Sequence, residues 1–318
     1  MKFAVLQFFS WPGRRVPLHT VYQRALDRIR IMDGGGFDAV WLAEHHFSIY
    51  SVCPSVHIMG MHVADITRNL RIGTGVSLAA FYHPLRLAEE VALLDNLSGG
   101  RVNWGAGRGF DRTEMSAFGV SGDESYPRFR ENVDIVQKAW QDGPLTYEGR
   151  FSSFRDIEVL PKPLQDPIPT WIATSSTGAS DWAASLGHAI LMSPHATHGE
   201  IQSQYAHYRT ALAEHGHRHD RDIPIARLIA IAPTDAAAEA VAQNGAQWTV
   251  DAYAGPRQGS KAERVERYVN DVIIHGSPAK VVDELKRLEE EVPVDYLLAS
   301  ILSHETLVLL TDEVLPRM

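Results

Sequence analysis

Short apolar segments alternate with longer segments of helical period along most of this chain. The segments expected to form strands are residues 2–8, 38–42, 70–78, 101–106, 170–173, 189–192, 225–231 and 294–299. Between them, apolar side chains recur every three or four residues, as in amphipathic helices. The helices expected in this way are residues 18–32, 56–66, 85–97, 128–140, 179–186, 200–215, 235–248 and 278–291. This alternation predicts parallel strands joined by crossover helices.

Two α/β architectures can be built from such units. About eight β/α units close naturally into a (β/α)8 TIM barrel of ~250 residues, and a longer chain leaves room for insertions. The rival is an open doubly wound sheet, which favours a Gly-x-Gly-x-x-Gly turn after its first strand. The segment after the first predicted strand, FSWPG at residues 9–13, does not have that spacing. The pattern therefore favours an α/β fold of the TIM-barrel class with insertions.

No charge run or low-complexity linker divides the chain, so we expect a single barrel domain over residues 1–318. The alternation breaks at residues 143–169, a proline-rich stretch that indicates an excursion from the barrel. A small hairpin is expected there, around residues 147–151 and outside the main sheet. A polar, glycine-containing stretch near residues 250–265 is typical of a lid over an active site, and a plain disordered loop is the alternative.

Composition and charge narrow the classes of partner. The net charge of −9 argues against nucleic acid, because a duplex-binding surface needs concentrated Lys and Arg. No apolar segment approaches the ~20 residues that cross a bilayer, and the N-terminal residues lack the pattern of a cleaved signal peptide. We therefore expect a cytoplasmic protein without a membrane partner. The single cysteine, Cys53, excludes an intrachain disulfide and a Cys-built zinc site; it is expected to be a small buried side chain, and no metal site is expected.

The candidate catalytic residues follow the second predicted strand. Active sites of (β/α)8 barrels lie at the carboxyl ends of the strands, and residues 38–42 are followed almost at once by Glu44, His45 and His46. A histidine titrates near neutral pH and often serves as a general acid or base. The alternative is that Glu44 and His46 only pair with each other at the rim of the barrel.

Two other strand ends carry groups suited to a phosphate. Arg108 lies in the segment GAGRG, where glycines let the backbone approach a ligand and the guanidinium suits anionic oxygens. Ser175, Ser176 and Thr177 follow another strand and open a helix. Hydroxyls, free N–H groups and the helix dipole together favour an anion there. A plain tight turn at Arg108 and ordinary N-capping by the hydroxyls are the alternatives.

The order and spacing of these segments resemble those of the bacterial luciferase-like, flavin-dependent monooxygenases. The similarity covers most of the chain and is carried by WLAEHHF (41–47), RIGTGV (71–76), HPLRLAEE (83–90), LDNLSGGR (94–101), GAGRG (105–109), residues 175–184 and residues 302–317. The resemblance implies a barrel that uses reduced FMN and dioxygen to oxygenate a small organic substrate. It also implies a separate flavin reductase that supplies the reduced FMN, and a homodimer, because related barrels often dimerise.

Site residues follow from the resemblance by position. His45 matches a family histidine beside the flavin that acts as a catalytic acid or base, and Glu44 and His46 are its neighbours. Arg108 and Ser176 match phosphate-binding positions.

Ser175 and Thr177 lie on the same phosphate-binding loop. Gly75 and Val76 lie where the family has a non-prolyl cis peptide bond beneath the flavin ring, so both are expected to contact the cofactor.

Several positions depart from the luciferases. Gly107 stands where they carry a reactive cysteine, Pro194 where they have a tryptophan near the flavin, and Ser175 where they have a glutamate. Light emission is therefore not expected, and an aliphatic aldehyde substrate is not assumed. Two alternatives stay open: a deazaflavin-dependent oxidoreductase that moves hydride without dioxygen, and a non-catalytic flavin-binding protein.

Overall fold

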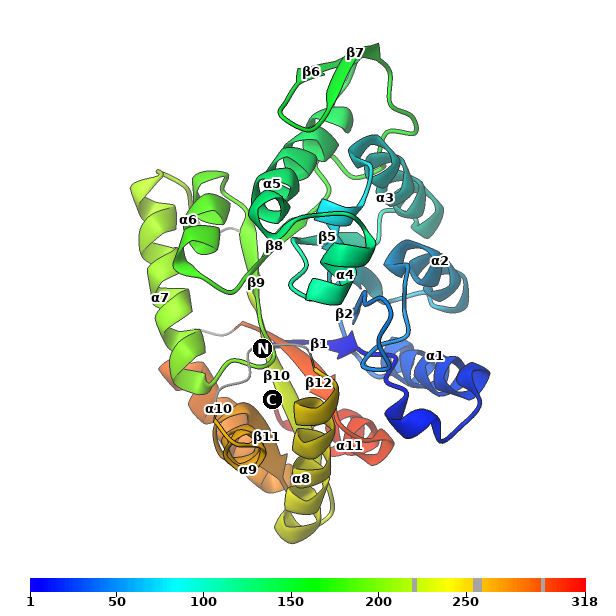
Figure 1. Ribbon diagram of the computed structural model, residues 1–318. Coiled ribbons are helices and arrows are strands. Elements are labelled where there is room, and N and C mark those ends of the chain that lie inside the picture. Colours follow the sequence, from blue (N-terminus) through cyan, green and yellow to red (C-terminus); the bar gives the residue numbers. More distant parts are fainter. Residues whose placement is uncertain (219–221, 254–258, 293–294) are drawn as a thin grey trace.

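A computed structural model of the chain describes residues 1–218, 222–253, 259–292 and 295–318. Its main sheet is parallel and curls around a central core, with helices covering the outside (Figure 1). The strand order is β11-β10-β12-β1-β2-β3-β5-β8-β9, with β4 paired to β5. Strand β9 also contacts β10, which brings the curled sheet back upon itself. The predicted α/β fold of the TIM-barrel class is confirmed.

The main-sheet strands coincide closely with the predicted apolar segments. They are β1 Lys2–Gln7, β2 Ala39–Leu42, β3 Arg71–Thr74, β4 Ser77–Leu78, β5 Val102–Gly107, β8 Thr170–Thr174, β9 Ala189–Met192, β10 Pro224–Ile231, β11 Ile273–Gly276 and β12 Tyr296–Ile301. The single strand expected at residues 70–78 is in fact two, divided at Gly75–Val76. Strand β11 was not predicted, because its four residues directly follow a helical turn and no Gly or Pro marks its start.

The long helices alternate with these strands. They are α1 Leu18–Gly34, α2 Val56–Ile66, α3 Pro84–Ser98, α5 Gly122–Ala139, α6 Thr177–Ser185, α7 His198–Glu214, α8 Asp235–Ala252 and α10 Pro278–Glu291. Shorter helical segments are α4 Arg112–Ala117, α9 Lys261–Arg267, α11 His304–Leu309, η1 Pro12–Arg14, η2 Ala79–Phe81, η3 Tyr268–Val272, η4 Leu310–Val314 and η5 Leu315–Arg317. Over the ranges that the structure describes, no helix is long and apolar enough to cross a membrane.

Helix α5 begins earlier than the sequence predicts. An interior proline removes a helical hydrogen bond, so the helix was expected to start after Pro127, yet it runs from Gly122 through that proline. The Ser121 hydroxyl caps the start and accepts a hydrogen bond from the Glu124 N–H at 3.3 Å. The earlier start matters because it places Ser125 beside the end of β5.

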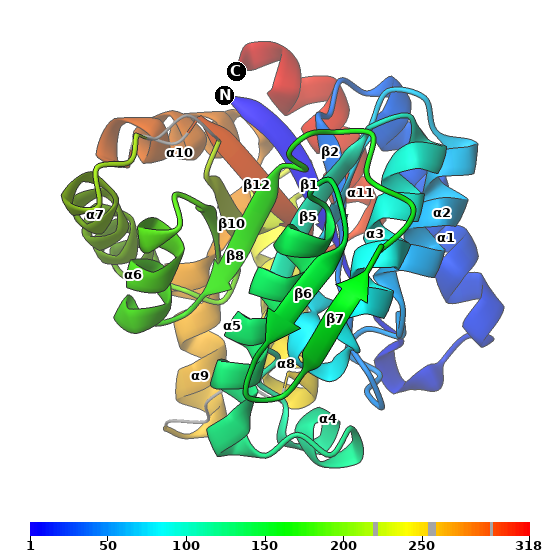
Figure 2. The same cartoon turned by 90° about the horizontal axis from the view of Figure 1, so that it is seen from above.

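An antiparallel hairpin of β6 Leu145–Glu148 and β7 Ser153–Ile157 occupies the expected excursion. It is a separate two-stranded sheet lying outside the barrel (Figure 2). The Glu131 carboxylate on α5 accepts hydrogen bonds from the N–H groups of residues 150–152 and so holds the turn.

The lid expected near residues 250–265 is only partly described. Its middle, residues 254–258, lies outside the described residues. On either side, residues 250–252 complete α8 and residues 261–265 belong to α9, which the Ser260 hydroxyl caps. A lid in this segment and a single domain over residues 1–318 both stay predictions.

The interior of the barrel is filled by large side chains, so it is a core and not a channel. Trp41 is completely buried, and its ring meets that of Trp171 edge to face at 5.2 Å. The Trp41 indole N–H donates to the Tyr296 hydroxyl at 3.3 Å, and that hydroxyl donates to Asp38 at 2.8 Å. Because the interior is closed in this way, a ligand site must lie above it, at the ends of the strands.

The single cysteine, Cys53, is buried, as predicted. Burial raises the pKa of its thiol to about 12. The thiol therefore stays protonated at neutral pH and behaves as a small apolar side chain.

A substitution at Gly73 tests the packing of this interior. A Cβ at position 73 would lie 2.2 Å from Cδ2 of the buried Trp41 ring. We expect Gly73→Ala to lower the free energy of unfolding by about 1–3 kcal/mol, because the ring has no free space to enter. Urea unfolding measures the change. Gly199→Ala, where a Cβ meets nothing within 4 Å, is the matched control, and equal effects of the two would contradict the prediction.

Candidate functional site

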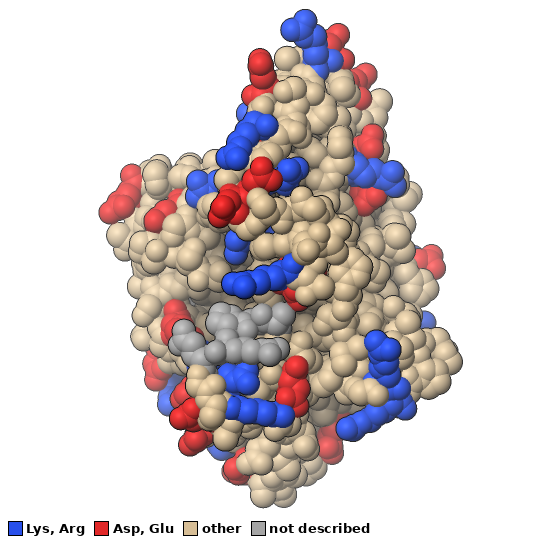
Figure 3. All heavy atoms as spheres, in the orientation of Figure 1, with Lys and Arg blue, Asp and Glu red and all other residues tan. Residues whose placement is uncertain are grey.

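The carboxyl ends of the parallel strands meet at one mouth of the barrel. Phe8 after β1, Val76 between β3 and β4, and Ala173 near the end of β8 pack on the inner core below this mouth. The loops that follow β2, β5, β8 and β9 surround it. Lys and Arg side chains lie over α5 and near α4 on the face shown in Figure 3.

Glu44 and His46, at the end of β2, are engaged with each other. Glu44 is 2% exposed, and its Oε1 lies 3.1 Å from His46 Nε2. The Tyr82 hydroxyl donates to both oxygens of this carboxylate, at 3.0 and 3.1 Å. Burial and the nearby Glu44 raise the pKa of Tyr82, so its hydroxyl keeps the proton that it donates. This contact matches the pairing that the sequence left open as an alternative for Glu44 and His46.

His45 turns the other way, toward the mouth. Its backbone N–H donates to the Cys53 carbonyl at 3.1 Å, and its ring is next to the rings of Phe8, Tyr50 and Phe110. Its Nδ1 lies 3.4 Å from Glu114 Oε1, while its Nε2 has no partner within the described parts of the chain. An ionised Glu114 only accepts, so it favours the proton on Nδ1 and leaves Nε2 able to take up a proton.

Glu114 is a site residue that the sequence did not reveal. It lies in α4 and is 1% exposed, and its Oε1 also accepts from the His46 N–H at 2.8 Å. The six residues of α4 are too few to show a helical period, so no helix was expected there. One signal was present: Asp111 three residues before Glu114 is the spacing of a capped helix start. The Asp111 carboxylate does accept from the Thr113 N–H, at 2.6 Å.

Replacing Glu114 tests whether it orients His45. We expect Glu114→Gln to lower turnover about tenfold or more, because a charge-assisted contact of about 1.5–3 kcal/mol is lost while the side chain keeps its size. Steady-state kinetics at saturating flavin measure the change. Glu124→Gln on α5, the control, removes a carboxylate that lies 3.9 Å from Arg128 and from Arg150. If both variants lose turnover equally, Glu114 has no special role.

Arg108 and the loop at residues 175–177 come from neighbouring strands. Strand β5 pairs with β8 in parallel, with Gly105 opposite Trp171, so the residues after both strands emerge side by side. One Nη1–H of Arg108 donates to the Ser125 hydroxyl at 3.1 Å. Elsewhere in the described chain its guanidinium has no partner, so other N–H groups are available to an anion.

The loop itself presents hydroxyls and helix N–H groups to solvent. Ser176 is the N-cap of α6, and its hydroxyl accepts from the Ala179 N–H at 3.4 Å, a long contact. Ser175, Ser176 and Thr177 are exposed. The amides of the first turn have no partner within the helix. The N-capping that the sequence offered as an alternative is therefore present, and it leaves the anion-binding groups free.

A second arginine lies beside this loop and was not predicted. Arg130 on α5 donates from Nη2 to the Gly178 carbonyl at 3.4 Å. Its guanidinium stacks on the rings of Tyr126 and Trp182, at 4.5 and 5.1 Å from their centroids, and its Nε is buried without a partner among the described residues. Only the packing of α5 against the start of α6 brings this cation to the loop.

The peptide bond between Gly75 and Val76 is cis, as the resemblance implied. Gly107 on β5 faces it, and a Cβ at position 107 would lie 2.3 Å from Val76 Cγ2. A Cβ at Gly75 would likewise lie 2.8 Å from Leu6 Cδ1. The absence of a side chain at these glycines lets Val76 and Leu6 pack closely against the backbone at the strand ends.

Sequence comparison identifies the family to which this arrangement is related. The profile of the family described as luciferase-like monooxygenase matches residues 1–295. The oxygenase component of the flavin-dependent trigonelline monooxygenase of Acinetobacter baylyi is 27% identical over 215 residues, which cover 66% of this chain and 59% of that protein. An uncharacterized protein of Sinorhizobium fredii, y4wF, is 40% identical over 167 residues, which cover 52% of this chain and 49% of that protein. The chain thus spans about half the length of the curated relatives it matches.

Structure comparison agrees over the full length. The crystal structure of monooxygenase RslO1 from Streptomyces bottropensis superposes with a TM-score of 0.88 and 27% identity, and the match covers 99% of both chains. The similarity therefore includes the strand ends and loops described above.

Proposed function

This chain belongs to the luciferase-like monooxygenase family, and from that premise we propose that it is a flavin-dependent monooxygenase. It uses reduced FMN and dioxygen to oxygenate a small organic substrate. One atom of dioxygen enters the substrate and the other leaves as water, with two electrons and two protons supplied by reduced FMN. The observation that carries the proposal is His45, turned into the barrel mouth and held by Glu114, with Arg108 and the 175–177 loop on the neighbouring strand ends.

The phosphate of FMN is held, in this proposal, by Arg108, Ser176 and the hydroxyls and amides of residues 175–177. Arg130 adds a second positive charge beside the loop. A guanidinium and a helix N-terminus both favour an anion, and here they lie on adjacent strands.

Gly75 and Val76, at the mouth between β3 and β4, would contact the flavin ring in this proposal. Val76 packs against Gly107, where there is no room for a side chain. The chemistry of dioxygen belongs to the flavin when it is bound, and the protein supplies position and electrostatics.

Proton handling falls to His45 in this proposal. Its Nε2 has no other partner in the described chain, and Glu114 steadies the opposite side of the ring. Glu44 and His46 are assigned a positioning role, because their contacts tie the end of β2 to Tyr82 and to α4. The neighbouring rings of Phe8, Tyr50 and Phe110 give the His45 ring a largely apolar setting.

A separate flavin reductase is the proposed source of reduced FMN. The trigonelline relative is named as an oxygenase component, which supports a two-component system. A coupled assay with a general NAD(P)H:flavin reductase tests this, since turnover should then depend on both proteins.

Binding and product analysis together test the function. Under anaerobic conditions, the chain is titrated with reduced FMN and with a reduced deazaflavin, and aerobic product is analysed with ¹⁸O-labelled dioxygen. We expect tight binding of reduced FMN and one labelled oxygen atom in the product. Tight deazaflavin binding with weak FMN binding would instead indicate a hydride-transferring oxidoreductase. Tight FMN binding without any oxygenated product across candidate substrates would indicate a non-catalytic flavin protein.

A homodimer is proposed through α2 and α3, which pack side by side. Ile58 on α2 is 76% exposed, Leu97 on α3 is 61% exposed, and Leu93 is also exposed. Large apolar side chains exposed on one pair of helices favour a partner that covers them, and a second copy of the chain brings the same side chains.

Light scattering after size exclusion measures the oligomeric state. We expect the native chain at twice 35.3 kDa and Leu97→Glu shifted toward monomer, with the dimer dissociation constant raised about tenfold or more by the buried charge. Leu186→Glu is the control, since Leu186 is exposed near the end of α6. A native monomer, or equal shifts in both variants, would rule out this interface.

A further inference from the structure

Aromatic side chains from separate loops line one side of the mouth beside His45. Phe8, Tyr50, Phe110 and Tyr253 form this aromatic wall. The Tyr253 ring lies 5.2 Å from Phe110 and 5.5 Å from Tyr50, and Tyr50 lies 5.0 Å from Phe8, between centroids. The His45 ring lies 5.2 Å from Tyr50 and 6.1 Å from Phe110. The wall therefore stands directly next to the proposed proton-handling residue.

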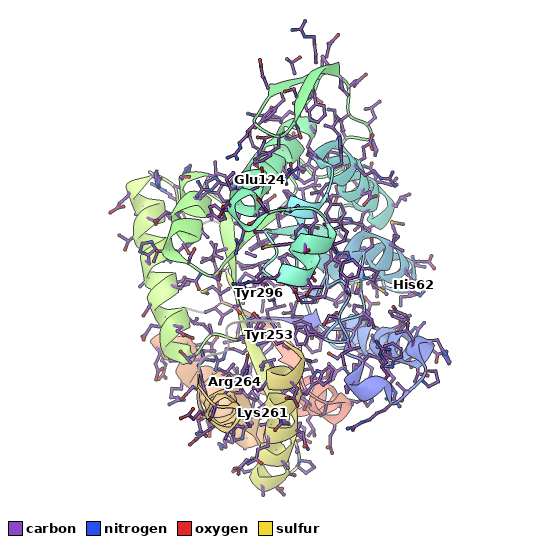
Figure 4. All side chains as sticks on the ribbon, in the orientation of Figure 1. His62, Glu124, Tyr253, Lys261, Arg264 and Tyr296 are labelled. Carbon is purple, nitrogen blue, oxygen red and sulfur yellow. The ribbon has the colours of Figure 1, made fainter. Side chains whose placement is uncertain are left out.

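The wall differs from the core because three of its four rings reach solvent. Phe110 is 40% exposed, Phe8 and Tyr253 are half-buried, and Tyr50 is buried behind them. Tyr253 follows α8 and lies near the centre of the face shown in Figure 4. Neighbouring apolar rings left accessible at the mouth of a barrel are typical of a ligand-binding surface.

His195, in the loop after β9, contacts two residues of the aromatic wall, Tyr50 and Tyr253. Its Nε2 lies 3.1 Å from the Tyr50 hydroxyl and its Nδ1 lies 3.1 Å from the Tyr268 hydroxyl. The Tyr253 ring lies 4.0 Å from the His195 ring, between centroids. Desolvation, with smaller effects of His45 and Arg267, lowers the pKa of His195 to about 3. The imidazole is therefore neutral at physiological pH, with one nitrogen donating and the other accepting.

Two polar atoms beside the wall have no partner within the described residues. One is His45 Nε2, and the other is the Tyr253 hydroxyl. Burial raises the pKa of Tyr253, so this hydroxyl is an uncharged donor. No Lys, Arg, Asp or Glu belongs to the wall itself, and Arg108 lies on the phosphate side. The rings of the wall are tilted by 48–59° to one another, so a bound ring could meet them both face to face and edge to face. The surface is apolar and uncharged, with a donor and an imidazole nitrogen beside it.

We propose that the substrate is a planar, uncharged aromatic compound that carries a hydroxyl or carbonyl oxygen. Its ring stacks on the aromatic wall, and its oxygen is bound by the Tyr253 hydroxyl or His45 Nε2. Aromatic pairs contribute about 0.5–1.5 kcal/mol beyond the area they bury. A flexible alkyl chain gains no such aromatic contribution to its free energy of binding. It also loses rotational freedom when it binds. The inference deepens the proposed function and rests on it for turnover, but the binding it predicts does not require catalysis.

Equilibrium binding to the full chain, with and without saturating oxidised FMN, tests the inference. The probes are 2-naphthol, decahydro-2-naphthol and 1-decanal, measured by calorimetry. The first two share a carbon skeleton and a hydroxyl, but only 2-naphthol is flat and aromatic. We expect 2-naphthol to bind about tenfold more tightly than either other probe. Equal or weaker binding of 2-naphthol would overturn the inference.

Substitutions of wall residues test whether 2-naphthol binds to the aromatic wall. Phe110→Leu is expected to weaken 2-naphthol about three- to tenfold and to leave decahydro-2-naphthol unchanged. Tyr253→Leu removes a ring and a hydroxyl donor, so it is expected to weaken 2-naphthol by a similar factor and decahydro-2-naphthol less. Phe118→Leu is the matched control, because Phe118 is 39% exposed and lies outside the wall, against His46 and Phe47. Circular dichroism checks that each variant folds. Unchanged 2-naphthol affinity in folded Phe110→Leu and Tyr253→Leu would overturn the assignment.

The proposed function is refuted by different measurements from those that refute this inference. Weak binding of reduced FMN, or the absence of labelled oxygen in every product, refutes the monooxygenase proposal. Binding of 2-naphthol to the wall would still stand in that case.

Discussion

Replacing His45 by alanine is expected to lower turnover about 100- to 10,000-fold, the range that a general acid or base contributes. The affinity for reduced FMN should change by no more than about twofold, because the phosphate contacts proposed for FMN come from β5 and β8, not from β2. Single-turnover kinetics together with an anaerobic FMN titration separate the two quantities.

His62→Ala serves as the control for this variant. His62 is an exposed histidine on α2 (Figure 4), so its loss should leave both quantities unchanged. If His45→Ala loses turnover and FMN affinity by equal factors, His45 is a structural or binding residue and not a proton-transfer group.

Arg108→Ala is expected to raise the dissociation constant of FMN about 10- to 100-fold, which corresponds to about 1.5–3 kcal/mol for a hydrogen bond to a charged group. Riboflavin carries the same ring system without the phosphate, so its affinity should change by no more than about threefold. Fluorescence titration with both flavins gives the comparison directly.

Arg112→Ala controls for a general loss of positive charge at the mouth. Arg112 is exposed at the start of α4, only a few residues from Arg108. Equal weakening of FMN and riboflavin by Arg108→Ala would show that the guanidinium supports the loop through Ser125 and does not bind phosphate.

Much of the architecture could be predicted from the local spacing of apolar residues in the sequence. Residues 56–66 and 189–192 were predicted to the residue as helix and strand, because apolar spacing reflects which face of each element is buried. The pattern was less informative at two short segments. Strand β11 directly follows a helical turn without a boundary residue, and the six residues of α4 are too few to show a period, so both were missed.

The interruption of the strand at residues 70–78 has a different origin. The apolar pattern continues through Gly75 and Val76, so periodicity alone predicts one strand. Only the resemblance indicated a cis bond there, and that bond separates β3 from β4 in the structure.

The three polar residues after β2 show a limit of predicting a site from the order of residues in the sequence. Glu44, His45 and His46 are adjacent, yet Glu44 and His46 pair near Tyr82 while His45 points into the mouth. Successive residues of an extended chain point to opposite sides, so adjacency in sequence is a poor guide to a shared site.

Local sequence pattern predicted the barrel, most of its strands and helices in order, and the strand end that carries His45. These follow from interactions between residues only a few positions apart, which leave a periodic signature in the chain. Only the tertiary structure decided that Glu114 faces His45, that Arg130 flanks the 175–177 loop, and that His195 fastens Tyr50 and Tyr253 into a wall. Such contacts join residues from different loops, and their distances depend on which strands become neighbours when the sheet closes.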